Sequence, residues 1–131
     1  MKKTLKGYIF SRSFMGERVP QGVQNLFLRE YCKKNKYNFQ LSSVEYRMNG
    51  SYIHLNNLVN NLKKYDGILA YSLFQLPNDP DVRTNLLIKI IKYKKTLHCA
   101  IEDIVIKDLN SIEKINDILS ITQTISSQLS L

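Results

Sequence analysis

The chain has 131 residues, of which 44% are hydrophobic, and nineteen Lys and Arg residues against eleven Asp and Glu residues give it a net charge of +8 at pH 7. This length and composition predict one domain, residues 1–131, that buries its own core without disulfides or metals, and they argue against a second domain. The positive charge suits an anionic partner such as nucleic acid, a phosphorylated metabolite or an acidic membrane surface.

The first predicted elements are a strand over residues 5–10 and a helix over residues 20–35. The strand carries Tyr8, Ile9 and Phe10 in succession, the aromatic and β-branched content of a strand buried on both faces. Apolar residues recur at helical spacing in the helix, and Pro20 suits its first turn, where the missing N–H costs nothing. The polar loop over residues 11–19 therefore joins a strand to a helix N-terminus, a position where α/β proteins bind ligands.

The next stretch predicts a brief second strand over residues 37–41 and a second exposed loop over residues 42–52. The loop is polar and contains Asn49 followed by Gly50, which is a turn signal. Spaced leucines and a valine then predict a helix over residues 52–64.

The most hydrophobic run of the chain, residues 68–74, predicts a central parallel strand because it is too continuous to alternate and too short for a helix. Either Asn78 or Asp79 can cap the helix that follows. The apolar positions of that helix are Val82, Leu86, Leu87, Ile90 and Ile91.

A fourth strand is predicted over residues 96–101, and residues 104–109 form a short segment that suits an edge strand. Asn110 then caps a last helix, with Glu113 as the partner of a capping box. The apolar stripe of this helix consists of Ile112, Ile115, Ile118, Leu119, Thr122, Ile125 and Leu129. If the stripe is wider than the sheet can cover, the surplus forms a homodimer contact through this C-terminal helix.

Strands and helices thus alternate along the chain, which predicts the α/β class. We expect a three-layer domain with a mostly parallel sheet of four to five strands and helices on both faces, joined by right-handed crossovers.

The loop after the first strand is the predicted binding site. The hydroxyls of Ser11 and Ser13, the guanidinium groups of Arg12 and Arg18 and the free N–H groups near Gln21 could together hold a phosphate. The alternative is structural: Arg18 pairs with Glu17 on the surface, and the serines close turns. We further expect Glu17, Gln24, Tyr46 and Gln75 among the ligand-binding residues.

Two acidic residues are candidates for a catalytic base or for contacts to sugar hydroxyls. Glu45 and Glu102 follow the second and fourth strands, whose carboxyl ends lie at the same rim as the first loop. A solvated or arginine-paired acid is an equal alternative for each. Together with Ser11 and Ser13 they complete the candidate catalytic set.

We expect no metal, no cofactor and no membrane span. His54 and His98 lack partners at metal-ligand spacing. Cys32 and Cys99 occupy apolar positions without a C-x-x-C spacing and predict reduced core thiols. No apolar run approaches the roughly 18 residues of a spanning helix, and the basic start lacks the long apolar stretch of a signal peptide, so a cytoplasmic location is expected.

Many lysines fall at predicted helix C-termini, where cations complement the helix dipole. Helix-end solvation is therefore the alternative to an anionic partner for these residues. They are Lys33, Lys34, Lys36, Lys63, Lys64, Lys89, Lys92, Lys94 and Lys95.

Two blocks of residues resemble the sporadic carbohydrate cluster proteins, small bacterial proteins that look to be encoded among surface-polysaccharide genes and have no assigned activity. The first block runs through residues 7–31 and the second through residues 70–77, and the resemblance covers about residues 5–105. The residues that carry it include Gly7-Tyr8-Ile9-Phe10-Ser11-Arg12-Ser13, Glu17-Arg18-Val19-Pro20, Gln24-Asn25, Glu45-Tyr46 and Ala70-Tyr71-Ser72-Leu73-Phe74-Gln75-Leu76-Pro77.

A weaker resemblance links the chain to the catalytic domain of serine recombinases, and it implies a resolvase-like or flavodoxin-like sheet. In that family a serine just after the first strand attacks a DNA phosphodiester, and Ser11 or Ser13 falls near that position. The assisting arginines do not match, because Phe10, Gln75 and Asn78 stand where the family pattern has arginine. Phosphoryl transfer depends on positive charge around the anion, so the departures imply a related fold without strand-exchange activity.

Two functional hypotheses follow. In the first, a protein of surface-carbohydrate biosynthesis binds a phosphorylated or nucleotide-linked sugar at the first loop, with or without catalysis. In the second, the chain is a non-catalytic interaction module of recombinase descent that binds nucleic acid or a regulatory partner. Positive potential in a concave pocket favours the small ligand, whereas a broad basic stripe favours nucleic acid.

Overall fold

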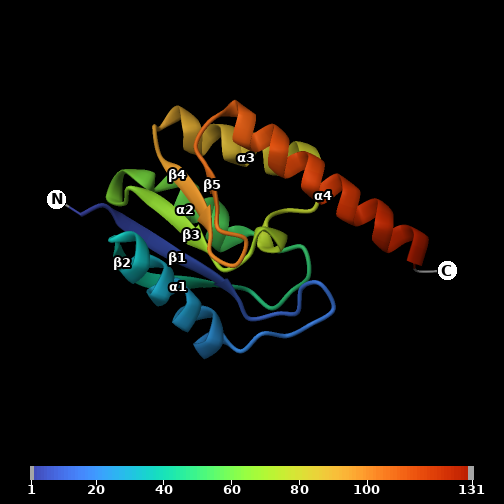
Figure 1. The fold of residues 1–131 in the computed structure, drawn as a ribbon, viewed down its shortest axis with the longest axis horizontal. Coiled ribbons are helices and arrows are strands. Elements are labelled where there is room, and N and C mark those ends of the chain that lie inside the picture. Colours follow the sequence, from blue (N-terminus) through green and yellow to red (C-terminus); the bar gives the residue numbers. More distant parts are fainter. Residues whose placement is uncertain (1, 130–131) are drawn as a thin grey trace.

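The structure is a computed structural model that describes residues 2–129, with the side chains of residues 126–129 outside the description. One five-stranded sheet has the order β2-β1-β3-β4-β5 (Figure 1). The three pairings among β1 to β4 are parallel, and β5 runs antiparallel to β4. The strands are β1 (Thr4–Phe10), β2 (Asn38–Glu45), β3 (Gly67–Ala70), β4 (Thr96–Cys99) and β5 (Ile104–Ile106). The predicted mostly parallel α/β sheet is confirmed.

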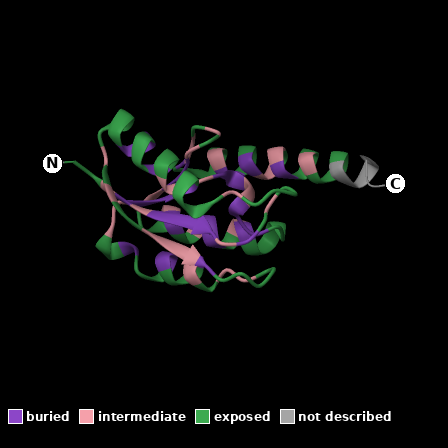
Figure 2. Ribbon diagram, turned by 90° about the horizontal axis from the view of Figure 1, so that it is seen from below, coloured by how far each residue is buried: buried purple, intermediate pink, exposed green. Residues whose placement is uncertain are grey.

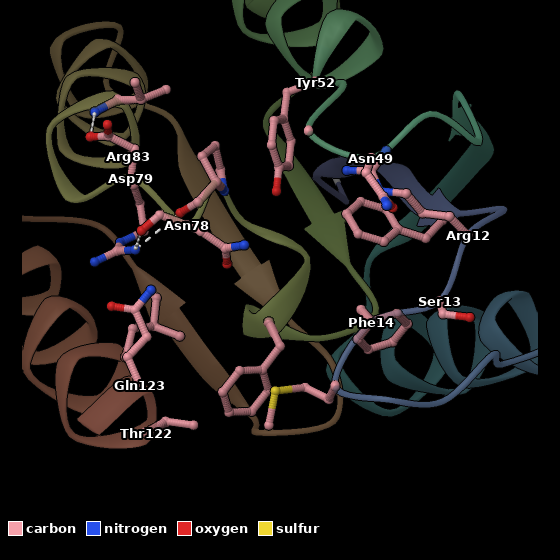
Figure 3. A pocket seen from close by; sticks show the side chains of 17 residues that line it. Arg12, Ser13, Phe14, Asn49, Tyr52, Asn78, Asp79, Arg83, Thr122 and Gln123 are labelled. Carbon is pink, nitrogen blue, oxygen red and sulfur yellow. Dashed lines mark hydrogen bonds between the residues drawn. The ribbon is translucent and has the colours of Figure 1, made fainter. Parts of the chain in front are cut away.

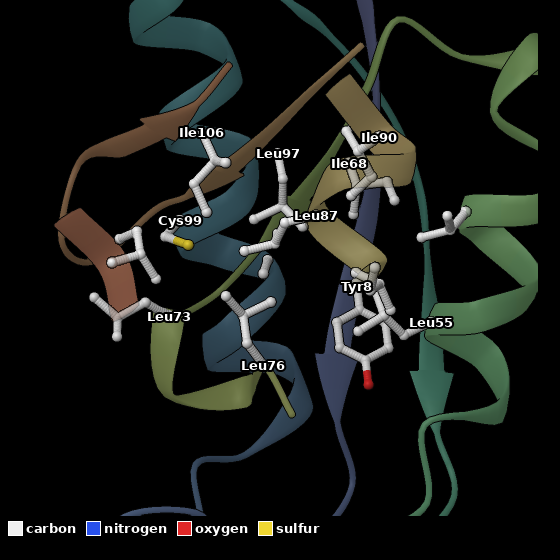
Figure 4. Packing of buried hydrophobic residues seen from close by; sticks show 14 of the residues in the cluster. Tyr8, Leu55, Ile68, Leu73, Leu76, Leu87, Ile90, Leu97, Cys99 and Ile106 are labelled. Atoms are coloured by element: carbon white, nitrogen blue, oxygen red, sulfur yellow. The ribbon is translucent and has the colours of Figure 1, made fainter. Parts of the chain in front are cut away.

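Helices cover both faces of this sheet. The helices are α1 (Gln21–Asn35), α2 (Ile53–Asn60), α3 (Pro80–Lys92) and α4 (Leu109–Leu129), with short 3-10 helices η1 (Leu62–Lys64) and η2 (Leu73–Gln75). On one face α1 packs Leu28 and Cys32 against Leu5 and Ile9. The larger core on the other face joins the sheet to α2, α3 and α4, and Figure 4 shows Leu87 beside Leu97 and Ile68.

The buried strands lie between two helical layers, as the burial colours of Figure 2 show. Consecutive residues of β1 therefore enter opposite cores: Ile9 belongs to the α1 side, and Tyr8 and Phe10 to the other. Cys32 and Cys99 are buried free thiols, one in each core. Burial raises the pKa of Cys32 to about 11, so this thiol stays protonated and unreactive at neutral pH.

Several predicted boundaries are wrong. β2 continues to Glu45, where a polar loop was expected, because its pairing with β1 extends to Phe10 opposite Glu45. β3 ends at Ala70, since the side chain of Ser72 accepts a hydrogen bond from the Phe74 N–H and begins η2. The polar end of β2 is a strand because of its pairing with β1, and the apolar segment after Ala70 leaves the strand because Ser72 caps η2. In both cases these contacts outweigh the intrinsic propensity of the residues.

The N-terminal caps of α3 and α4 can be compared with the predicted ones. Asp79 caps α3, because its side chain accepts hydrogen bonds from the N–H groups of Asp81 and Val82. The expected cap of α4 by Asn110 with Glu113 is wrong. The Asp108 carboxylate accepts from the Ser111 N–H at 2.8 Å, and the helix begins at Leu109, two residues earlier than a cap at Asn110 implies.

The C-terminal helix α4 extends beyond the sheet (Figure 1). Of the predicted stripe, Ile112, Ile115 and Leu119 are buried against the core, whereas Ile125 is 52% exposed. The stripe is therefore wider than the sheet covers, and the homodimer contact stays a prediction; Leu129, its last predicted member, lies outside the described side chains. None of the helices within residues 2–129 is long and apolar enough to cross a bilayer.

Replacing Gly7 with alanine is expected to destabilise the fold. Gly7 lies where the β1–β2 register shifts, and a Cβ atom there would meet the Ser42 hydroxyl at 2.2 Å and the Phe39 ring at 2.9 Å. Overpacking of this kind costs about 1–3 kcal/mol. Urea denaturation of Gly7→Ala measures the loss, with Gly22→Ala as the matched control: nothing lies within 4 Å of that Cβ position, and alanine favours the first turn of α1. Equal effects of the two substitutions would contradict the expectation.

Candidate functional site

The loops after β1 and β3 diverge at the carboxyl edge of the sheet. These strands are neighbours, but β1 leads to α1 on one face and β3 leads to α3 on the other. A crevice at the carboxyl ends of such strands is the usual ligand site of an open parallel sheet. The first loop thus occupies the predicted position.

The first loop folds into a tight turn before α1. Phe14 and Glu17 exchange two backbone hydrogen bonds of 2.9 and 3.1 Å. Met15 and Gly16 between them both have positive φ, 53° and 76°, which is the geometry of a two-residue hairpin turn and suits glycine at the second position. The turn places Phe14 and Met15 beside a cavity.

This cavity has a volume of about 820 Å³ and lies between the first loop, the start of α2, the η2–α3 segment and α4. Its volume is in the range of small-molecule sites. Aromatic rings of Phe10, Phe14, Tyr52 and Phe74 form much of the wall. Figure 3 shows Arg12 on one side and Arg83 on the other, with Tyr52 and Asn78 between them.

Arg12 is held by stacking and by one hydrogen bond. Its guanidinium carbon lies 4.1 Å from the centroid of the Phe10 ring and 5.1 Å from that of Tyr52. Nη1 donates to the Tyr46 carbonyl at 2.8 Å, and the residue is only 8% exposed. The predicted ligand-binding residue Arg12 therefore lines the cavity with a fixed, buried charge.

Arg83 is a second buried guanidinium in the cavity wall and was not among the predicted site residues. It is 3% exposed; Nε donates to Asn116 Oδ1 at 2.8 Å, and Nη1 donates to the carbonyls of Pro77 and Asn78 at 3.0 and 3.2 Å. Burial lowers the pKa of Arg83, and the charge of Asp79 partly offsets this. A signal was present in the sequence: Arg83 precedes Leu86, Leu87 and Ile90 by three, four and seven residues, so it lies on the apolar stripe of α3.

Glu45 is 1% exposed at the end of β2, where its carboxylate anchors the start of α2. Oε1 accepts from the Tyr8 hydroxyl at 2.9 Å and the Leu55 N–H at 3.1 Å, and Oε2 accepts from the N–H groups of Tyr46 and His54 at 3.1 and 3.2 Å. Burial, together with the Glu45 charge, raises the pKa of Tyr8, so its phenol stays protonated and donates. Glu45 is not part of the cavity wall.

Glu102, the other predicted acid, follows β4 and holds the start of η2. Its carboxylate accepts from the Ser72 hydroxyl at 2.7 Å and from the Leu73 N–H at 2.8 Å. With Glu17 and Val19 it lines a second, smaller cavity of about 320 Å³ on the other side of Phe14 and Met15. The structure therefore separates Glu102 from Arg12 and Ser13, which line the larger cavity.

Gln24 and Gln75, two predicted ligand-binding residues, are fully buried and bond to each other. Gln75 Nε2 donates to Gln24 Oε1 at 2.8 Å, and Gln24 Nε2 donates to the carbonyls of Phe10 and Val19. Gln75 Oε1 accepts from the Tyr71 N–H at 3.2 Å. These amides join the ends of β1 and β3 behind the first loop.

The remaining predicted site residues are dispersed. Ser11 donates its hydroxyl to the Glu45 carbonyl at 2.8 Å, and Ser13 is exposed at the cavity rim. Tyr46 contributes its carbonyl to Arg12, while its ring packs on His54. Glu17, Arg18 and Gln21 are exposed outside the larger cavity.

The opposite, amino edge of the sheet collects positive charge. Thr4, Asn38, Gly67 and Thr96 begin the four parallel strands side by side, and the preceding helix ends therefore meet at this edge. It lies at the left of Figure 1, near the N-terminus. Ten exposed lysines lie at this edge, and we call them the lysine edge. They are Lys2, Lys3, Lys33, Lys34, Lys36, Lys63, Lys64, Lys92, Lys94 and Lys107.

Two solved structures share the whole fold. The N-terminal catalytic domain of TP901-1 integrase superposes with a TM-score of 0.65 at 18% sequence identity, covering 96% of this chain and 99% of that chain. This is the fold of a serine recombinase catalytic domain. A resolvase family site-specific recombinase from Streptococcus pneumoniae gives a TM-score of 0.61, also at 18% identity, covering 95% of this chain and 93% of the other. No protein-family model and no curated protein matches the sequence.

The three residues at the positions where the resemblance expects arginine have other roles in this structure. Phe10 supports Arg12 by stacking, and Gln75 is committed to backbone groups and to Gln24. Asn78 contributes its carbonyl to Arg83. The resemblance to the carbohydrate cluster family stays a prediction.

Proposed function

We propose that this chain is a non-catalytic nucleic-acid-binding module with a serine recombinase fold, and that the lysine edge contacts the phosphate backbone. The observation that carries the proposal is the gathering of ten exposed lysines along one edge of the sheet. Asp66 and Asp108, two carboxylates close to lysines of this edge in the sequence, accept hydrogen bonds from the backbone N–H groups of Thr4 and Ser111. Neighbouring strands are about 4.8 Å apart, so four strand starts span roughly 15 Å, enough to follow several phosphates.

Two further features support this function over strand exchange. Tyr93 is 54% exposed between Lys92 and Lys94, where its ring is free to stack on an unpaired base. Ser11 donates its hydroxyl to a backbone carbonyl, and the arginines that would stabilise phosphoryl transfer are replaced by Phe10, Gln75 and Asn78. The two structural neighbours are an integrase catalytic domain and a recombinase, and neither points to the expected role in carbohydrate biosynthesis.

Fluorescence anisotropy with labelled single-stranded and duplex DNA tests the proposal. We expect binding at low salt whose log K falls linearly with log salt concentration, with a slope of roughly −4 if four to five phosphates are contacted. The triple variant Lys33→Gln, Lys34→Gln and Lys36→Gln should weaken binding at least tenfold at low salt and flatten the slope by roughly one unit per lysine lost.

The matched control removes the same charge elsewhere, through Arg18→Gln, Arg47→Gln and Lys114→Gln, all exposed residues. This control should change the affinity no more than about twofold, with only the residual long-range effect of net charge. Equal losses in both triple variants, or no retention of DNA at low salt, would refute the proposal. Binding to anionic lipid vesicles but not to DNA would assign the lysine edge to a membrane instead.

A further inference from the structure

None of the side chains that the structure describes neutralises the two guanidinium groups of the larger cavity by direct contact. The hydrogen bonds of Arg12 and Arg83 all go to uncharged oxygen atoms: the carbonyls of Tyr46, Pro77 and Asn78 and the side-chain oxygen of Asn116. Both residues are more than nine-tenths buried. A buried guanidinium without a carboxylate or phosphate partner is costly, and an anion that reaches it gains a charge-assisted, often bidentate, hydrogen bond.

The nearest acid does not complete such a pair. Asp79 lies at the cavity rim, but its Oδ1 accepts from the N–H groups of Asp81 and Val82 at 2.9 and 3.2 Å. Its charge acts on Arg83 through space, and it raises the pKa of Arg83 by less than burial lowers it. Arg12, on the other wall, faces aromatic rings.

The walls between the two guanidiniums are suited to a flat ring. Phe10, Phe14, Tyr52 and Phe74 present aromatic surface, and the side chains of Asn78 and Gln123 add amide groups. Aromatic side chains stack on nucleobases and on sugar rings, and amides bond to their polar edges.

We infer that this cavity binds a nucleotide, with Arg12 and Arg83 contacting its phosphates and the aromatic wall contacting its base or sugar. The site is independent of the lysine edge, because it lies at the other end of the strands. It shares Arg12 and Ser13 with the predicted phosphate site of the first loop, whereas Arg18 and Gln21 do not line the cavity. A nucleotide-linked sugar belongs to the same ligand class.

Isothermal titration calorimetry with ADP and UDP, as purine and pyrimidine probes, tests the inference. At least one should bind with a Kd below 1 mM, and the matching uncharged nucleoside should bind at least tenfold more weakly. Inorganic phosphate should also bind more weakly than the nucleotide, since it lacks the ring. Arg12→Gln and Arg83→Met should each reduce the affinity at least tenfold.

Two variants that each add one negative charge to α4 test the inference even if an arginine variant fails to fold. Gln123→Glu places a carboxylate at an exposed position of the wall and should weaken nucleotide binding at least fivefold by repulsion. Ser120→Glu adds the same charge at an exposed position of α4 outside the wall and should stay within twofold of the unmodified protein.

The lysine triple variant should leave nucleotide affinity unchanged, which separates this site from the proposed nucleic-acid surface. Absence of binding by both nucleotides at 1 mM would overturn the inference. Equal effects of Gln123→Glu and Ser120→Glu, or loss of binding in the lysine triple variant, would overturn it as well.

Discussion

Glu45→Ala is expected to destabilise the protein by about 3 kcal/mol or more, a large share of the 5–15 kcal/mol that ordinarily separates folded from unfolded domains. The substitution removes the acceptor of the buried Tyr8 hydroxyl and of the His54 and Leu55 N–H groups at the start of α2. Each buried donor left without an acceptor costs roughly 1–3 kcal/mol. Urea denaturation followed by circular dichroism measures the change.

Two companion variants define the cause. Glu45→Gln keeps one acceptor oxygen and should lose about half as much stability as Glu45→Ala. Glu113→Ala removes an exposed acid from α4 and should change stability by less than about 0.5 kcal/mol. A loss below about 1 kcal/mol in Glu45→Ala would show that solvent replaces the carboxylate and that α2 does not depend on it.

The sequence predicts an exposed loop at Glu45 because the partners that bury its carboxylate are distant in the chain. Three of residues 42–45 are polar, and nothing local indicates that this segment pairs with β1. The burial of Glu45 depends on Tyr8, 37 residues earlier in the chain, and on the N–H groups of His54 and Leu55 at the start of α2. Apolar runs and helical spacing were sufficient for the order of the elements because those signals are local.

The cavity was harder to predict for the same physical reason. Its wall combines four separate segments, and only Arg12 and Ser13 of the predicted site residues contribute to it. Gln24 and Gln75 were expected to bind the ligand, but their amides bond to backbone groups at the strand ends. The sequence places most lysines of the lysine edge at helix ends. That these ends lie at one edge of the sheet depends on the parallel topology, in which α1, η1 and α3 each end shortly before the next strand begins.

Acidification below pH 6.5 is expected to destabilise the fold through His98. The imidazole is 2% exposed; Nδ1 lies 2.7 Å from the Tyr31 hydroxyl and Nε2 lies 2.9 Å from the Thr96 hydroxyl. Burial, with a smaller contribution from the charge of Lys3, lowers the pKa of His98 to about 4. Between pH 6.5 and 4 the unfolded chain therefore takes up a proton that the folded protein rejects, and stability falls with falling pH.

The full difference corresponds to about 3 kcal/mol, present above pH 6.5 and lost by about pH 4. Urea denaturation at half-unit steps from pH 7 to pH 4 should therefore give a steeper loss of stability in the unmodified protein than in His98→Gln, whose amide can still donate and accept but does not titrate. The carboxyl groups that also titrate in this range are common to both proteins and cancel in the difference. Parallel curves would mean that the folded protein accepts the proton, so that Tyr31 and Thr96 hold an imidazolium as readily as an imidazole.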